Sequence, residues 1–77
     1  MKYRHLQVVK ITVNHFVGKE NYCDAIGVIT DVDPQPANQY EVAFSTGYIN
    51  WFNKDEITFA TEDEITKAFV DMVLFSL

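Results

Sequence analysis

The chain has 77 residues, which is enough for one domain, and a domain of this size buries only about 60% of the surface of its unfolded form. A hydrophobic fraction of 48% excludes a disordered chain, and no apolar stretch reaches the length of a membrane-spanning helix, about 18 residues. The only cysteine, Cys23, excludes an internal disulfide. No hydrophobic leader follows the first residues, so we expect a single domain in a reducing cytoplasm.

Charge is divided unevenly along the chain, whose net charge is −5. The first 19 residues lack acids and hold four basic residues, Lys2, Arg4, Lys10 and Lys19. Residues 20–77 carry all 11 acids against two lysines, which gives −9. The basic arm is a small footprint for nucleic acid, which argues against nucleic acid as the default partner. The −9 segment suits solubility or docking onto a basic partner.

The first predicted strand covers residues 6–17. Apolar Val9, Ile11 and Val13 alternate there with polar residues, a period of two that is typical of a half-buried strand. A loop is expected at residues 18–25, which contain glycine and asparagine.

The second predicted strand covers residues 26–32. Gly27 within it indicates a bulge or a sharp bend. Residues 33–39, with the sequence DPQPANQ, are expected to form a loop because proline cannot occupy a central strand.

A hairpin follows, with strands at residues 40–45 and 48–53 around a turn at Thr46–Gly47. If the turn has two residues, the buried face consists of Tyr40, Val42, Phe44, Ile49 and Trp51. A three-residue turn would instead bury Tyr48 and Phe52. We expect the two-residue turn, because it buries the aliphatic and indole side chains of the second strand.

The last part of the chain predicts a turn at residues 53–56, a short strand at 57–60 and a helix from about residue 62. Thr61 and Glu64 have the spacing of a capping box. Acidic residues in the first turn also favour the positive end of the helix dipole. We therefore expect the helix to begin at this point and to run to the C-terminus.

This helix is apolar around nearly its whole circumference. At about 100° per residue, one stripe contains Ile65, Ala68, Phe69, Met72, Val73 and Phe75. The opposite side carries Val70, Leu74 and Leu77. Such helices are buried on two sides, and a chain this short has little material to cover both. We therefore expect a homodimer with Val70, Leu74 and Leu77 at its interface; the alternative is that residues 73–77 pack as a short strand.

Several short motifs occur together: GVITDV at residues 27–32, YEVAF at 40–44, Thr46–Gly47, Trp51–Phe52 and Glu56–Ile57. Over about residues 8–60, this pattern resembles SH3-like small barrels of the KOW and Tudor kind, and short bacterial and phage or prophage proteins built on such a barrel. The resemblance implies a five-stranded SH3-like barrel and leaves the C-terminal helix outside. Together with the helix predicted above, it gives a mainly β single domain, with the barrel at about 6–60 and the helix at about 62–77. Closure into a barrel would remove exposed sheet edges.

The resemblance also implies a binding module for proteins, peptides or nucleic acids, and it carries over no catalytic residue. Tyr22 in the long loop, with Tyr48 and Phe52 on the outer face of the hairpin, would form an exposed aromatic patch. Glu41 would lie at its rim. Aromatic residues of comparable loops line ligand grooves in SH3-like and Tudor barrels. The competing interpretation is that some of these aromatics complete a small core.

No pattern predicts a metal, a cofactor or catalysis. His5 and His15 are too far apart for the close ligand pairs of zinc sites, and Asp31 with Asp33 lacks the glycine and terminal glutamate of a calcium loop. A nucleophilic pair of Cys23 with His15 would also need a third orienting group and a cleft.

The sequence therefore predicts a small, non-enzymatic, cytoplasmic protein that binds or regulates a protein partner and forms a homodimer, and that could be encoded by a phage or mobile element. Two alternatives stay open. The first is an acidic inhibitor whose −9 segment mimics nucleic-acid charge on a host enzyme. The second is a weak nucleic-acid binder that uses the basic N-terminal arm.

Overall fold

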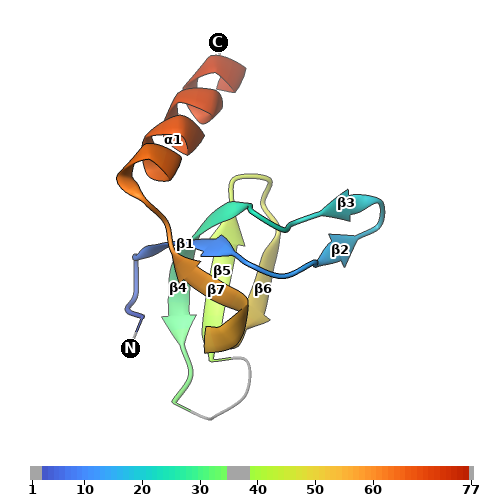
Figure 1. Cartoon of the computed structure of the whole chain (residues 1–77), viewed down its shortest axis with the longest axis vertical. Helices are drawn as coiled ribbons and strands as arrows, with labels where there is room; N and C mark the ends of the chain where they lie inside the picture. Colours follow the sequence, from blue (N-terminus) through green and yellow to red (C-terminus); the bar gives the residue numbers. More distant parts are fainter. Residues whose placement is uncertain (1–2, 35–38, 77) are drawn as a thin grey trace.

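The computed structural model describes residues 3–34 and 39–76, whose strands, single 3₁₀ turn and single helix are shown in Figure 1. In chain order the elements are β1 Val8–Ile11, β2 Phe16–Val17, β3 Glu20–Asn21, β4 Ile26–Val32, β5 Tyr40–Phe44, β6 Ile49–Phe52, η1 Lys54–Glu56, β7 Ile57–Phe59 and α1 Glu62–Ser76. Five strands form an antiparallel sheet in the order β6-β5-β4-β1-β7, while β2 and β3 form a separate hairpin. The predicted mainly β fold with a C-terminal helix is confirmed.

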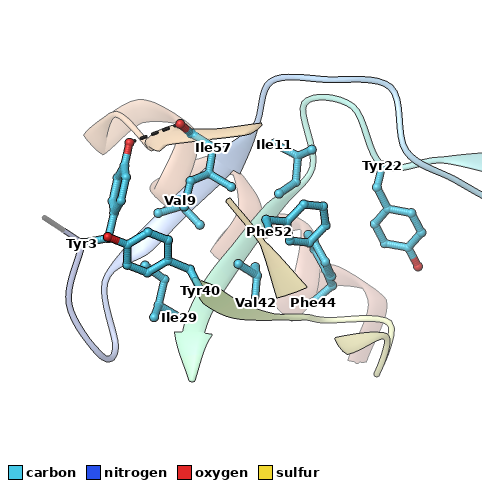
Figure 2. Close-up of a cluster of buried hydrophobic side chains, with 10 residues drawn as sticks. All are labelled: Tyr3, Val9, Ile11, Tyr22, Ile29, Tyr40, Val42, Phe44, Phe52 and Ile57. Carbon is cyan, nitrogen blue, oxygen red and sulfur yellow. Dashed lines mark hydrogen bonds between the residues drawn. The ribbon is translucent and has the colours of Figure 1, made fainter. Parts of the chain in front are cut away.

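The sheet is open rather than closed into a barrel. Within the described residues, β6 and β7 lie at its two edges and no strand pairing joins them. Both edges nevertheless contribute to one core, because Phe52 of β6 and Ile57 of β7 belong to the same cluster of buried side chains (Figure 2). The sheet is therefore curved around its core.

The core follows the alternation that the sequence predicted for β1 and β5. Its buried members are Tyr3, Val9, Ile11, Tyr22, Ile29, Tyr40, Val42, Phe44, Phe52 and Ile57 (Figure 2). Tyr3 closes one end, where its hydroxyl donates a hydrogen bond of 3.1 Å to the carbonyl of Ile57 and its ring lies 5.2 Å from that of Tyr40. Burial raises the pKa of the Tyr3 hydroxyl, which keeps it protonated as a donor.

The hairpin of β5 and β6 has a three-residue turn, so the expected two-residue turn is wrong. Residues 45–47 form the turn, and the N–H of Phe44 donates to the carbonyl of Tyr48 at 2.9 Å. Gly47 has φ 91°, in the left-handed region that the third residue of such turns adopts.

The longer turn exchanges the two faces of β6. Phe52 is only 1% exposed, whereas Ile49 is 54% exposed and Trp51 is half-buried. Because side chains alternate along a strand, one additional turn residue moves each of them to the other face. The buried set expected for this strand is therefore wrong at Ile49 and Trp51.

The first predicted strand is shorter than expected. β1 ends at Ile11. The last two residues of the predicted strand form β2 and part of the predicted loop forms β3, and the hairpin of β2 and β3 projects from the sheet (Figure 1). Gly18 opens the turn of this hairpin with φ 62°. Of the loop predicted at residues 33–39, positions 35–38 lie outside the described residues.

Gly27 is required by close packing, and the β-bulge lies elsewhere in the same strand. The pairing of β4 with β5 shifts between Ile29 and Asp31. A Cβ atom at Gly27 would lie 3.0 Å from the carbonyl oxygen of Ala43 and 3.1 Å from Cδ1 of Phe44. The absence of a side chain at Gly27 therefore allows β5 to approach β4 closely.

The caps predicted before α1 are confirmed. The N–H of Glu64 donates to the Thr61 hydroxyl at 3.1 Å, and the Glu64 carboxylate accepts the N–H of Thr61 at 2.9 Å. The predicted turn before β7 is the 3₁₀ turn η1, with its own capping box between Asn53 and Glu56. Because α1 continues to Ser76, the alternative of a strand at residues 73–77 is wrong.

Candidate functional site

Aromatic rings from distant parts of the chain form a cluster beside the β5–β6 turn. The ring of Tyr22 lies 4.8 Å from that of Phe44 and 4.9 Å from that of Tyr48. The ring of His15 lies 5.0 Å from that of Phe52. Ring pairs at such distances contribute about 0.5–1.5 kcal/mol each beyond their burial. The cluster therefore fixes the base of the β2–β3 hairpin against the sheet.

The four predicted partner-binding residues do not share one exposed patch. Phe52 and Tyr22 are 1% and 6% exposed, and Tyr48 is half-buried against them. The expected exposure of Phe52 on an outer face is wrong, because the three-residue turn places this side chain on the buried face of β6. Glu41 is half-buried, and its carboxylate accepts a hydrogen bond of 2.9 Å from the Thr30 hydroxyl.

Hydrogen bonds occupy the polar ends of this cluster. His15 Nε2 lies 2.8 Å from the Tyr48 hydroxyl and 3.2 Å from Asn50 Nδ2. Both groups are within hydrogen-bond distance of Nε2, so the imidazole is tied to the β5–β6 hairpin at this nitrogen. The hydroxyls of Tyr22 and Thr46 lie 3.0 Å apart. Every buried side-chain nitrogen and oxygen of the described residues has a partner, so the cluster has a structural role.

A groove of about 500 Å³ lies where α1 meets the rest of the molecule. Its lining comes from α1 residues 64–72 on one side and from residues 20–26 and 44–46 on the other. We term this feature the junction groove. It combines apolar and acidic side chains from three separate parts of the chain.

An ion pair connects the start of α1 to β1. Lys10 Nζ lies 2.7 Å from a carboxylate oxygen of Glu64, with the two side chains 27% and 29% exposed. The hydrogen bond from Lys10, followed by the backbone N–H of Thr61, lowers the pKa of the Glu64 carboxyl to about 2. The same hydrogen bond raises the pKa of the Lys10 ammonium. Both groups are therefore charged at neutral pH.

Beyond this connection, α1 exposes apolar side chains on both of the sides that the sequence distinguished. Val70 and Leu74, which we expected at a dimer interface, are 46% and 63% exposed. The stripe that included Phe69 is also open to solvent, since Phe69 is 60% exposed. Leu77 and the side chain of Phe75 lie outside the part of the chain that the structure describes.

Four of these side chains form what we term the outer face of α1, namely Phe69, Val70, Val73 and Leu74. With 3.6 residues per turn, this face is roughly opposite Ala68, which lines the junction groove. One side of α1 therefore borders the groove, and the other side points away from the sheet.

The structure also places the cysteine and the acidic and histidine side chains that the sequence raised as candidates for catalysis or metal binding. The free thiol of Cys23 is half-buried, and the Cys23 N–H donates to the side chain of Asn21. Over residues 3–34 and 39–76, no group of three His, Cys, Asp or Glu side chains is arranged to hold a metal ion. No helix in that part of the chain has the length and apolar character needed to cross a membrane.

The basic N-terminal arm is divided between elements. Lys10 lies on β1 and is paired with Glu64. Arg4 precedes β1, while Lys19 lies in the turn of the β2–β3 hairpin, and Lys2 lies outside the described residues.

Sequence reasoning did not find the junction groove, because its residues come from three distant segments and share no local spacing. Asp24 and Asp71, for example, line the same groove only because of where α1 lies. Comparison with protein-family models, with curated proteins and with solved structures finds no match for this chain. The functional argument therefore depends on the geometry of the groove and of the outer face.

Proposed function

We propose that this chain is a small, non-enzymatic protein-binding module whose curved, open sheet is an SH3-like barrel without the closing strand pairing, and that two copies pair through α1. The observation that carries the proposal is the outer face of α1. Its four apolar side chains are exposed by 60% at Phe69, 46% at Val70, 41% at Val73 and 63% at Leu74, on a helix that extends away from the sheet (Figure 1). A contiguous exposed apolar surface of this kind is typical of protein interaction sites.

A second copy is the occupant that matches the chemistry of this face. The α1 sequence has no charged residue after Asp71, whereas Glu62, Asp63 and Glu64 are concentrated in the first turn. An antiparallel pair keeps the two acidic first turns at opposite ends, while a parallel pair would bring like charges together.

The outer face is also self-complementary. In an antiparallel pair centred between Val70 and Val73, these two residues face each other across a two-fold axis. Phe69 of each copy then faces Leu74 of the other. Such an isologous contact uses the same surface of both copies and closes as a dimer.

The connectivity supports the SH3-like assignment of the barrel. The first and last strands of the sheet, β1 and β7, are paired, and a long connection separates β1 from β4. A tight hairpin and a 3₁₀ turn precede the last strand. The core shared by both sheet edges favours the same assignment.

The environment of the reactive side chains supports a non-enzymatic role. The His15 ring is held by the Tyr48 hydroxyl and the Asn50 amide, and it lies within the structural aromatic cluster. A free thiol at Cys23 agrees with the reducing compartment that we propose for this protein.

The pairing is tested by measuring the molar mass in solution with light scattering over a range of concentrations. We expect the mass of two chains of 8.9 kDa each. Phe69→Glu and Leu74→Glu place charges in the apolar contact and should each give a monomer with an unchanged circular dichroism spectrum. Ile49→Glu is the matched control, because Ile49 is 54% exposed on β6 and is not part of the outer face, so this variant should stay dimeric.

Two results would contradict the proposal. One is a wild-type mass of a single chain at every concentration up to the millimolar range. The other is a Phe69→Glu and Leu74→Glu double variant that remains dimeric, which would place the interface on another surface.

A further inference from the structure

We propose that the junction groove is a second binding site, and that it takes a basic segment of a partner protein through an arginine or lysine side chain. The proposal extends the assignment as a binding module, but it does not depend on the pairing of two copies.

The first argument is the shape and the apolar lining of the groove. Its volume of about 500 Å³ lies within the range of ordinary ligand sites. Apolar lining comes from Ala25 and Ile26 at the start of β4, from Phe44 at the end of β5 and from Ala68 on α1. An extended segment of a partner can therefore bury apolar surface here.

The second argument is the charge at the rim. The lining contains four carboxylates and one ammonium group, which gives a net charge of −3: Glu20, Asp24, Glu64, Asp71 and Lys67. Glu64 is already paired with Lys10. Within the described residues Glu20, Asp24 and Asp71 form no close ion pair, and Asp24 interacts with Lys10 only through longer-range attraction. These carboxylates can therefore contact a cation of a partner.

These two properties together define the occupant. The alkyl stem of a lysine or arginine covers apolar surface while its charged end stays at a polar rim. Arginine suits the site best, because its planar guanidinium can bind two carboxylates at once and carries a weakly held hydration shell. Asp24 and Asp71 line the groove from different elements, one from the β3–β4 connection and one from α1. A polyanion such as nucleic acid is repelled by the same charges.

The groove and the outer face are on different sides of α1. Ala68 and Asp71 line the groove, whereas Phe69 and Leu74 do not. A monomeric Phe69→Glu variant should therefore keep the groove intact, which allows the two proposals to fail separately.

The test is an NMR titration with two blocked tripeptides, acetyl-Leu-Arg-Leu-amide and the same peptide with citrulline in place of arginine. Citrulline has nearly the shape of arginine but no charge. We expect the arginine peptide to shift backbone amide signals of residues 20–26, 44–46 and 64–72, in wild type and in Phe69→Glu alike. The citrulline peptide should bind at least about fivefold more weakly, as expected for two partly exposed ion pairs.

Variants of the rim give the decisive comparison. The double variant Asp24→Asn and Asp71→Asn should bind the arginine peptide about fivefold more weakly than wild type. Asn suits the φ of 68° at residue 24, so this change should leave the fold intact. The control is Asp31→Asn with Asp55→Asn, which changes the net charge equally at two exposed positions outside the groove and should have no effect.

Three outcomes would overturn the proposal. The first is equal binding of the arginine and citrulline peptides. The second is a set of shifts confined to residues outside the groove, or no shift at millimolar peptide. The third is unchanged affinity in the variant of Asp24 and Asp71.

Discussion

The sheet and the helix of this protein differ sharply in how far their apolar side chains are buried. In the sheet, Val9, Ile11, Ile29, Val42 and Phe52 are fully buried. In α1, by contrast, every side chain that the structure describes is exposed or half-buried. Full burial stabilises a fold by about 1.5–3 kcal/mol per large apolar side chain. The folded state of a single chain is therefore stabilised mainly by the sheet.

The difference indicates separate roles for the two regions. The contacts of α1 with its own domain include the ion pair of Lys10 with Glu64 and the sides of the junction groove. An ion pair at the surface adds little to stability, because water and salt screen it. The apolar content of α1 thus exceeds what its own domain uses, and a partner surface is the physical use that we propose for it.

The largest expected difference in stability is between two phenylalanine-to-alanine substitutions, one in the sheet and one in the helix. Phe52→Ala should lower the free energy of unfolding by about 3–5 kcal/mol, because it leaves a cavity in a fully buried site. For a domain of this size, that loss removes most of the stability. Phe69→Ala should change it by less than about 0.5 kcal/mol in the monomer. Urea unfolding followed by tryptophan fluorescence measures both values.

To separate the monomer from the dimer, the measurement should be made on the Ile49→Glu and Leu74→Glu backgrounds in parallel. If Phe69→Ala and Phe52→Ala lowered the free energy of unfolding by similar amounts in the monomeric background, the difference between the sheet and the helix would be contradicted. It would mean that α1 packs on its own sheet in solution.

Local chemistry explains which parts of the fold could be predicted. The alternation at Val9 and Ile11 and the capping box of Thr61 with Glu64 depend only on neighbours in sequence, and both are confirmed. The prediction for the β5–β6 turn depended on its length, which differs by one residue between the two alternatives. Gly47 at the third turn position favours the longer turn, whereas the apolar character of Ile49 and Trp51 favours the shorter one.

The candidate sites were less predictable, because they depend on where α1 lies relative to the sheet. Helical spacing identified Val70 and Leu74 as apolar positions away from the main stripe, and the structure leaves both exposed. The same spacing could not show that Phe69 is exposed as well. The presence of Asp24 and Asp71 in the lining of one groove has no signal in the local sequence.

A second way to sharpen the comparison is Gly27→Ala. The added methyl group would overlap Val42 Cγ1 and press on the Ala43 carbonyl, so β4 and β5 must separate. Overpacking of this kind should cost about 1–3 kcal/mol in urea unfolding. Thr66→Ala, at an exposed position of α1, is the helical counterpart and should be neutral or slightly stabilising. A neutral Gly27→Ala would show that this part of the sheet is loosely packed.

A smaller effect is expected at Tyr48→Phe. The change removes the hydroxyl that lies 2.8 Å from His15 Nε2 and keeps the ring contacts with Tyr22 and Phe44. We expect a loss of about 0.5–1.5 kcal/mol in urea unfolding, which is the usual contribution of one hydrogen bond. No loss would mean that water replaces the hydroxyl and that His15 is not held by Tyr48.

The smallest effect is expected at the connection between the two regions, and it depends on pH. The pKa of Glu64 is lowered to about 2 from an ordinary value of 4.5 by the hydrogen bond from Lys10 and the N–H of Thr61. A carboxyl whose pKa is lowered in the folded state stabilises that state above its unfolded pKa, and the contribution disappears as the pH falls toward the folded value. The helical circular dichroism signal of wild type should therefore decline between about pH 4.5 and pH 2 more than that of Glu64→Gln.

Glu62→Gln removes the same charge from the same helical turn and should keep the wild-type decline. Equal pH profiles for wild type and Glu64→Gln would mean that the ion pair with Lys10 does not hold α1 to the sheet, and that the cap at Thr61 alone determines where the helix begins.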